Sequence, residues 1–205
     1  MILKQFIFGF LENNNYLLID EVSKEAVLID CTENSEKIGI MLKETGAKLK
    51  YLLLTHGHFD HVMGVNSLRN DYDCKVLINE ADVPLLNTMS EHAMNFGLKA
   101  EGIAKVDGYL KDEEVIKLSN IEIKVIFTPG HTKGGVCFLI GDKLFSGDTI
   151  FYESVGRTDL PGGNFQELVN SIQSRIFALD ENVKIYPGHG ICTTVGHEKI
   201  NNKFL

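Results

Sequence analysis

The sequence lacks paired cysteines, which limits both its possible cross-links and its metal chemistry. It contains no C-x-x-C pair, and its four cysteines lie far apart, at Cys31, Cys74, Cys137 and Cys192. A disulfide framework and a cysteine-rich zinc site both need closely spaced or paired cysteines. Neither is therefore expected, and Cys137, inside an apolar run, is interpreted as a small buried hydrophobic residue.

Long apolar runs and an excess of positive charge are also missing. The chain has 20 Lys and Arg against 28 Asp and Glu, a net charge of -8, which argues against nucleic acid or an anionic membrane as partner. No stretch approaches the roughly 18 apolar residues of a membrane span, and Met1–Phe8 is too short and mixed for a signal peptide. We therefore expect a cytoplasmic protein that acts on a small molecule, with its oligomeric state open.

What the sequence does contain is one dense histidine motif, Thr55-His56-Gly57-His58-Phe59-Asp60-His61. Four apolar residues precede it, so a buried strand is expected to deliver three imidazoles and a carboxylate to its own end. Such ligands suit zinc, iron or manganese. Gly57 permits a sharp turn in which His56 and His58 face one ion, while Asp60 and His61 face a second. The alternative, a closed zinc site that only holds the fold, would favour cysteine ligands.

Three further candidate ligands follow predicted strands. Pro129-Gly130-His131 and Pro187-Gly188-His189 each come after an apolar segment, and Pro and Gly end the strand in a turn that leaves the histidine projecting. Asp148 adds a carboxylate just past another strand. Each of these residues alone is typical of a turn, but their conjunction with the histidine motif favours metal binding. The remaining histidines, His92 and His197, are interpreted as surface residues.

Apolar patterning predicts alternating strands and helices in the first half of the chain. We predict strands over 3–8, 16–19 and 26–29, separated by the polar stretches 13–15 and 20–24. Further on we predict a helix after Thr32 that stops at Gly46, the strand before the motif, a helix to about Tyr72, a strand over 75–78 and a helix from Glu80. Residues 88–105 show no clear period and are predicted to be irregular, as either a lid over the site or a surface excursion.

The second half repeats this organisation. Strands are predicted over 115–118, 121–127, 136–140 and 143–145, followed by a helix that Asn164 caps with Glu167 as its reciprocal partner, a strand over 183–186 and a helix from Val195. No linker, repeat or low-complexity tract separates the halves. Two sets of strands with flanking helices predict an α+β protein, a four-layer αββα sandwich, with residues 1–205 forming a single domain.

The order of these motifs resembles the metallo-β-lactamase superfamily, from the N-terminal strands to Leu205. Within that superfamily, Gly147–Phe151 followed by Gly156–Gly163 resembles the short glyoxalase II-like hydrolases. The resemblance implies an αββα sandwich with the site at its rim. It also implies two metal ions and a bridging carboxylate, with the ligand sets His56, His58 and His131 for one ion, Asp60, His61 and His189 for the other, and Asp148 between them.

Other members of the superfamily remain alternatives. True lactamases lack a bridging carboxylate at the position of Asp148 and are normally exported, whereas persulfide dioxygenases share most of the ligands but use a single iron. Ribonuclease-like members share them too, although the acidic composition argues against RNA. The longer glyoxalase II enzymes carry a C-terminal helical domain that helps bind glutathione, and here sixteen residues follow His189, so glutathione specificity stays open.

These observations predict a metal-dependent thioester hydrolase. Two divalent ions, zinc first and iron or manganese as alternatives, would share a hydroxide that attacks an S-acyl thiol such as S-lactoylglutathione, whose thiolate leaves without strong protonation. Asp60 would orient the attack as a catalytic residue. Arg157 either binds an anionic group of the substrate or pairs with Asp159. The rival functions are a mononuclear iron oxygenase of the persulfide dioxygenase type and a non-catalytic metal-binding scaffold.

Overall fold

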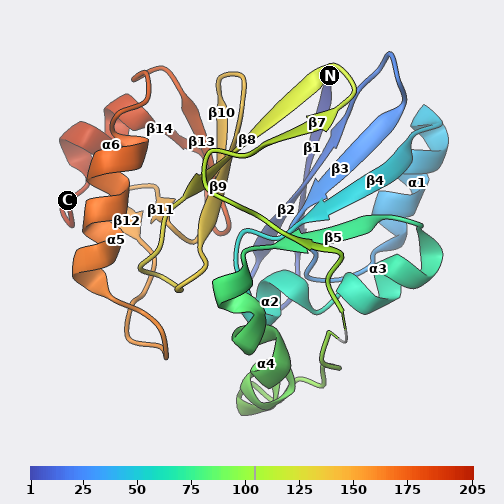
Figure 1. Ribbon diagram of the computed structural model, residues 1–205, viewed down its shortest axis with the longest axis horizontal. Helices are drawn as coiled ribbons and strands as arrows, with labels where there is room; N and C mark the ends of the chain where they lie inside the picture. Colours follow the sequence, from blue (N-terminus) through green and yellow to red (C-terminus); the bar gives the residue numbers. More distant parts are fainter. Residues whose placement is uncertain (104) are drawn as a thin grey trace.

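The computed structural model describes residues 1–103 and 105–205, and these form two six-stranded sheets and one short hairpin (Figure 1). The first sheet has the order β1-β2-β3-β4-β5-β6, with β1 (Ile2–Phe8), β2 (Asn13–Ile19), β3 (Glu25–Ile29), β4 (Lys48–Leu53), β5 (Lys75–Ile78) and β6 (Gly108–Tyr109). The second has the order β14-β13-β10-β9-β8-β7, with β7 (Val115–Leu118), β8 (Ile121–Phe127), β9 (Val136–Ile140), β10 (Lys143–Gly147), β13 (Lys184–Pro187) and β14 (Thr193–Thr194). The hairpin pairs β11 (Ile150–Phe151) with β12 (Ser154–Val155).

Helices cover the outer face of each sheet. On the first sheet lie α1 (Glu36–Thr45), α2 (Phe59–Val62), α3 (Val65–Asp71) and α4 (Val83–Asn95), the last preceded by a 3-10 turn (Glu80–Asp82). On the second lie α5 (Phe165–Ser171), which continues as a π-helical turn (Ile172–Ile176), and α6 (Val195–Asn201). Figure 1 shows α1 and α3 at one side, α5 and α6 at the other, and the strands between them.

Side-chain alternation along the strands builds three apolar clusters and so produces the four layers. In β2, Leu17 and Ile19 pack under the helices of the first sheet, while Tyr16 and Leu18 face the second sheet. Phe138 and Phe145 meet Tyr16 from the second sheet, with the rings of Tyr16 and Phe145 at 5.1 Å. Because successive strand residues point to opposite faces, one strand serves two clusters at once. The predicted four-layer αββα sandwich is confirmed.

Most predicted elements appear close to their expected positions. The side chain of Ser35 caps α1, and Gly46 ends it in the left-handed conformation at φ 67°, as the glycine stop predicts. Asn164 caps α5 by accepting from the backbone N–H of Glu167. In return, the Glu167 side chain is expected to accept from the Asn164 backbone N–H. That N–H donates to the carbonyl of Gly130 instead.

Two helix predictions need correction. The helix expected up to Tyr72 is split into α2 and α3 at Gly64, where an added Cβ would lie 2.6 Å from the backbone of Glu33, so the chain passes too close for a regular side chain. The segment expected to be irregular from residue 88 is helical to Asn95. Met89 and Ala93 continue the buried stripe that starts at Leu86, and this packing stabilises α4. Residue 104 of the predicted irregular segment lies outside the described residues.

The prediction that residues 13–15 separate two strands is wrong. Asn13, Asn14 and Asn15 belong to β2, pair with β1 and are all almost completely buried. Their side chains hydrogen bond to residues far away in the chain, which compensates for the low intrinsic preference of asparagine for strands.

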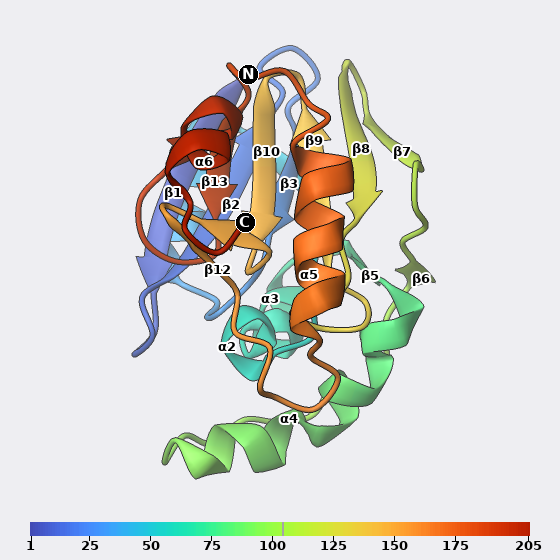
Figure 2. The same cartoon turned by 90° about the vertical axis from the view of Figure 1, so that its left-hand side faces the viewer.

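Among the described residues, no helix is long and apolar enough to cross a membrane. Both sheets run so that several strand ends meet at one rim of the sandwich, and Figure 2 shows α2 and α4 beside that end of the strands.

Candidate metal centre

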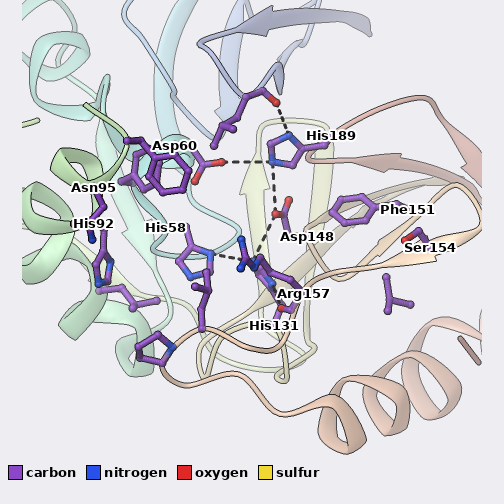
Figure 3. Close-up of a pocket in the computed structure, with 17 residues that line it drawn as sticks. His58, Asp60, His92, Asn95, His131, Asp148, Phe151, Ser154, Arg157 and His189 are labelled. Atoms are coloured by element: carbon purple, nitrogen blue, oxygen red, sulfur yellow. Dashed lines mark hydrogen bonds and ion pairs between the residues drawn. The ribbon is translucent and has the colours of Figure 1, made fainter. Parts of the chain in front are cut away.

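Seven candidate ligands converge where strands of the two sheets end, and Figure 3 labels five of them: His58, Asp60, His131, Asp148 and His189. From the first sheet, β4 leads into the loop with His56 and His58 and then into α2, which carries Asp60 and His61. From the second sheet, β8, β10 and β13 lead to the last three candidates, His131, Asp148 and His189. The chain therefore brings together ligands that lie up to 133 residues apart, from His56 to His189.

The ligand atoms form groups within which they lie no more than 4.8 Å apart. His56, His58 and His131 form one group, and Asp60, His61 and His189 form another. Asp148 groups with His56 and His61, and its Oδ2 lies 3.6 Å from Nε2 of both His131 and His189. Asp148 thus lies between the two sets, the arrangement that two ions with a bridging carboxylate require. That these residues bind metal stays a prediction.

Outer hydrogen bonds orient three of the imidazoles. Nδ1 of His131 donates to the backbone carbonyl of Arg157 at 2.7 Å, and Nδ1 of His189 donates to that of Leu11 at 2.9 Å. Nδ1 of His61 lies 2.8 Å from a carboxylate oxygen of Asp30. A carbonyl or carboxylate oxygen accepts only, so each of these Nδ1 atoms carries the proton and each Nε2 of the neutral ring presents a lone pair to the cluster.

Two buried atoms at the centre of the cluster have no hydrogen-bond partner among the described residues, Nε2 of His56 and Oδ1 of Asp148. A buried polar atom without a partner costs about 1–3 kcal/mol. Nδ1 of His58 and Nε2 of His131 also face one another at 2.9 Å. Imidazole and carboxylate lone pairs that converge in a buried cluster are what a bound cation satisfies, so the residues present fit divalent metal ions.

Charge distribution in the cluster supports the same interpretation. Burial raises the pKa of both carboxyl groups, but His61 and other neighbours hold the pKa of Asp148 well below its usual range and that of Asp60 at about 2. Burial and His131 lower the pKa of His58 to about 3. Burial also disfavours charge on His61, yet Asp148, Asp60 and Asp30 raise its pKa well above the ordinary value. In the metal-free cluster the ionised carboxylates therefore favour a second proton on His61, and a bound metal ion would replace that proton at Nε2.

Asp30 is a functional residue that the sequence interpretation missed. It is 1% exposed, and its carboxylate accepts hydrogen bonds from the backbone and hydroxyl of Thr55 and contacts His61. Asp30 directly follows β3. A carboxylate just past an apolar strand was the signal used for Asp148, and the same signal applied to the N-terminal strands would have selected Asp30.

Asp82 was also missed, and it joins the two histidine loops. Its fully buried carboxylate accepts from the backbone N–H of Gly57 at 3.0 Å, from the hydroxyl of Thr132 at 2.8 Å and from the backbone N–H of Gly134 at 2.6 Å. An added Cβ at Gly57 would lie 2.8 Å from the Asp82 carbonyl and 2.9 Å from Cβ of Leu85. Gly57 is therefore needed for close packing against the start of α4.

Comparison with known proteins identifies the family. A family model described as the metallo-beta-lactamase superfamily matches residues 9–189, which include all seven candidate ligands. The chain belongs to the metallo-beta-lactamase superfamily. It is thus a member of a metallo-hydrolase superfamily, and divalent metal binding at the His/Asp cluster agrees with that membership.

Three relatives of this superfamily are informative. Hydroxyacylglutathione hydrolase GloC of Haemophilus influenzae is 34% identical over 208 residues, which cover 97% of this chain and 95% of that protein. The crystal structure of BLEG-1 B3 metallo-beta-lactamase has a TM-score of 0.91 at 32% identity and covers 99% of both chains. The crystal structure of TTHA1623 in a di-iron-bound form has a TM-score of 0.89 at 35% identity and covers 98% of this chain and 100% of that one.

A cavity of about 470 Å³ opens above the cluster of this superfamily member. Five candidate ligands line its floor: His58, Asp60, His131, Asp148 and His189. Apolar side chains from several elements form most of its walls, among them Leu11, Phe59, Leu85, Phe96, Phe151 and Leu160. The size and the mixture of apolar walls with a few polar groups suit a small-molecule substrate.

The interpretation of His92 as a surface residue needs correction, because it is half-buried and lines the cavity from α4 together with Asn95 and Phe96. The Phe96 ring lies 5.1 Å from that of Phe59. Part of the segment interpreted as either a lid or a surface excursion therefore lies over the site. His197 lies on α6, with Nε2 3.1 Å from Glu153, and does not line the cavity.

Arg157 lines the cavity and is also paired. Its Nε and one terminal nitrogen donate to the two carboxylate oxygens of Asp159 at 2.8 and 2.7 Å, and the side chains are 56% and 67% exposed. The two interpretations considered for Arg157 are therefore compatible, because a solvent-exposed pair is weak enough to exchange partners.

Proposed function

We propose that this chain is a binuclear metal-dependent hydrolase that cleaves a thioester, an S-acyl thiol such as S-lactoylglutathione, and that residues 1–205 act as one domain. The observation that carries the proposal is the pair of three-ligand groups with Asp148 between them, open to a substrate-sized cavity. Hydroxyacylglutathione hydrolase as the function of a relative at 34% identity supports the thioester, and the di-iron form of another supports two ions.

His56, His58 and His131 would hold one ion, Asp60, His61 and His189 the other, and Asp148 both. Bound there, two divalent ions lower the pKa of water towards neutrality and polarise a carbonyl group. Hydrogen bonds with other residues of the chain would fix the orientation of the ligand rings. Asp30 keeps the His61 ring in place, and the backbone carbonyl of Arg157 does the same for His131.

Asp60 is a candidate ligand whose ionised carboxylate also borders the cavity, and this places it to act on the attacking water. It accepts a hydrogen bond from the water and directs the oxygen towards the acyl carbon. The water gives up one proton to solvent as its oxygen forms the new C–O bond, the C–S bond breaks, and the thiolate leaves with the electron pair and takes up a proton from solvent. Thiols have pKa values near 8.5, so this leaving group needs no strong acid.

We expect purified protein to contain close to two transition-metal ions per chain, because seven candidate ligands exceed what one open tetrahedral site needs. Zinc is the first expectation and iron the second. Elemental analysis of protein purified without added metal measures the number and kind of bound ions. A panel of thioester substrates, assayed on the same protein, measures the hydrolase activity. The panel should contain S-lactoylglutathione, a neutral acyl thioester and a chromogenic β-lactam as a control substrate.

Each rival function has its own signature in that experiment. A single iron that persists under metal-replete conditions, with oxygen uptake and no thioester turnover, would replace the hydrolase with an oxygenase. Hydrolysis of the β-lactam in preference to every thioester would assign the chain to lactamase chemistry. Bound metal without any of these activities would support the scaffold.

Replacing Arg157 with alanine should raise KM for an anionic thioester about fivefold with little change in kcat. The guanidinium would bind an anionic group of the thiol carrier away from the scissile bond, so ground and transition states lose the contact equally. Fivefold corresponds to about 1 kcal/mol, the low end for a charge-assisted contact because the side chain is half-exposed. The bond from His131 to the Arg157 backbone survives the change, which protects kcat.

Asp159→Asn is the matched variant for Arg157. It weakens the competing ion pair while leaving the guanidinium in place, so KM for the anionic thioester should fall. Steady-state kinetics on one anionic and one neutral thioester compare the two variants. Equal KM changes on both substrates, or a loss of thermal stability alone, would leave Arg157 a structural residue.

A further inference from the structure

The side chain of Asn13 contacts two members of one of the two ligand groups. It is completely buried at the start of β2, and its Nδ2 donates to Oδ2 of Asp60 at 2.9 Å. The same nitrogen lies 3.4 Å from Nε2 of His189. Oδ2 of Asp60 is also the oxygen that faces the other ligands, at 3.5 Å from His189 and 3.7 Å from His61. Asn13 therefore touches two members of the group formed by Asp60, His61 and His189.

The Asn13 amide is oriented so that its donor meets the Asp60 carboxylate, although this orientation lowers the stability of the fold. Its Oδ1 is buried and has no hydrogen-bond partner among the described residues. Turning the amide over would not help, because the carbonyl oxygen would then face the Asp60 carboxylate and the donor would be lost. An unpartnered buried oxygen lowers stability, and such an exception in a folded protein needs a reason other than stability.

Asn13 is held firmly enough to impose this geometry. Its backbone pairs with His189 in an isolated antiparallel bridge, and the backbone N–H of Asn14 donates to the Gly188 carbonyl at 2.7 Å. The Asn14 side chain donates to the carbonyls of Pro187 and Gly190, both at 2.9 Å. These hydrogen bonds hold β2 against the loop that carries His189. Because they involve no metal ion, they fix the position of Asn13 relative to that loop before any ion binds.

We propose that Asn13 is a positioning residue for the second metal ion: its amide fixes the Asp60 carboxylate and the edge of His189 in the ligand arrangement, at a cost in stability to the metal-free protein. The inference rests on the binuclear centre of the proposed function. It concerns metal affinity directly, because a carboxylate ligand held by a second hydrogen bond loses less freedom when it coordinates.

The test uses Asn13→Leu, which is similar in volume, and Asn13→Ala, which cannot overpack. Metal-free protein is titrated with Zn²⁺ in competition with a chromophoric chelator, and its melting temperature is measured separately. Both variants should bind the first ion as the wild type does and the second about 10- to 100-fold more weakly. The variants lose the unpartnered oxygen together with the hydrogen bond to Asp60, and these two effects on stability oppose each other. The melting temperature of the metal-free Asn13 variants should therefore fall by less than that of the control variant Asn15→Leu.

Asn15→Leu is the matched control, since Asn15 is buried in the same strand and bonds both ways with Thr32. Its melting temperature should fall by about 4 °C or more, with no selective loss of the second ion. If the Asn13 variants bind each of the two ions as tightly as the wild type does, or if neither variant folds, this inference is wrong while the binuclear centre still stands. A wild-type chain that binds only one Zn²⁺ would overturn the binuclear centre, and this inference with it.

Discussion

Replacing Asp60 with asparagine is expected to lower kcat by about 100-fold or more while the protein stays folded. Nδ2 of Asn13 donates to the Asp60 carboxylate. To keep that hydrogen bond, the new amide must place its oxygen where Oδ2 lies, facing His61 and His189, and its NH₂ group where Oδ1 lies. A neutral amide then replaces an ionised carboxylate, which weakens the contact with an ion and leaves a donor in place of one of the two acceptor oxygens.

Steady-state kinetics, elemental analysis and a thermal melt on the same preparation separate the possible causes. Asp142→Asn makes the same chemical change in an exposed turn, where the carboxylate pairs with Lys143, and should leave kcat unchanged. If Asp60→Asn turns over thioester at the wild-type rate with its metal content intact, Asp60 has no part in the chemistry.

Replacing Gly188 with alanine is expected to be nearly as damaging, although it alters no ligand. An added Cβ would lie 2.3 Å from Oδ1 of Asp148 and 2.7 Å from Cε1 of His61, so both side chains must move. Displacement of about 1 Å at a reacting centre costs about 100-fold in rate. Overpacking of this kind also destabilises a fold by about 1–3 kcal/mol.

Metal content should distinguish a displaced site from a collapsed fold. We expect Gly188→Ala to retain the ion of His56, His58 and His131 and to lose most of the second, because His61 belongs to the second group and Asp148 lies 3.6 Å from His189 in it. Gly102→Ala is the control, since the nearest atom to its added Cβ lies 3.9 Å away, at the Leu86 carbonyl. Two tightly bound ions and normal turnover in Gly188→Ala would show that the loop adapts without moving either side chain.

The candidate ligands could be located from the sequence because their signals are local. His56, His58, Asp60 and His61 lie within six positions directly after an apolar strand, and the strand itself delivers them to the rim. His131 and His189 each follow a Pro-Gly turn at the end of a strand. Short-range patterns of this kind survive folding, because backbone geometry fixes where a strand end points.

The fold class was predictable for a related reason. Alternation of apolar and polar residues at the start of β8, and a continuous apolar run in β9, report how many faces each strand buries. Asn164 and Gly46 mark helix ends through hydrogen bonds and backbone conformations that involve only their near neighbours. Two sets of such elements left few arrangements other than two packed sheets with outer helices.

The sequence by itself therefore determined the layers and the seven candidate ligands, whereas the tertiary structure alone decided what holds those ligands in place. Asn13 and its neighbours are typical of a turn, and only partners near Asp60 and Pro187 make their burial in a strand possible. Asp82 accepts hydrogen bonds from Gly57, which lies 25 residues before it in the sequence, and from Gly134, which lies 52 residues after it. Buried polar groups are stabilised by whichever donors and acceptors surround them, and that environment exists only once the chain has folded.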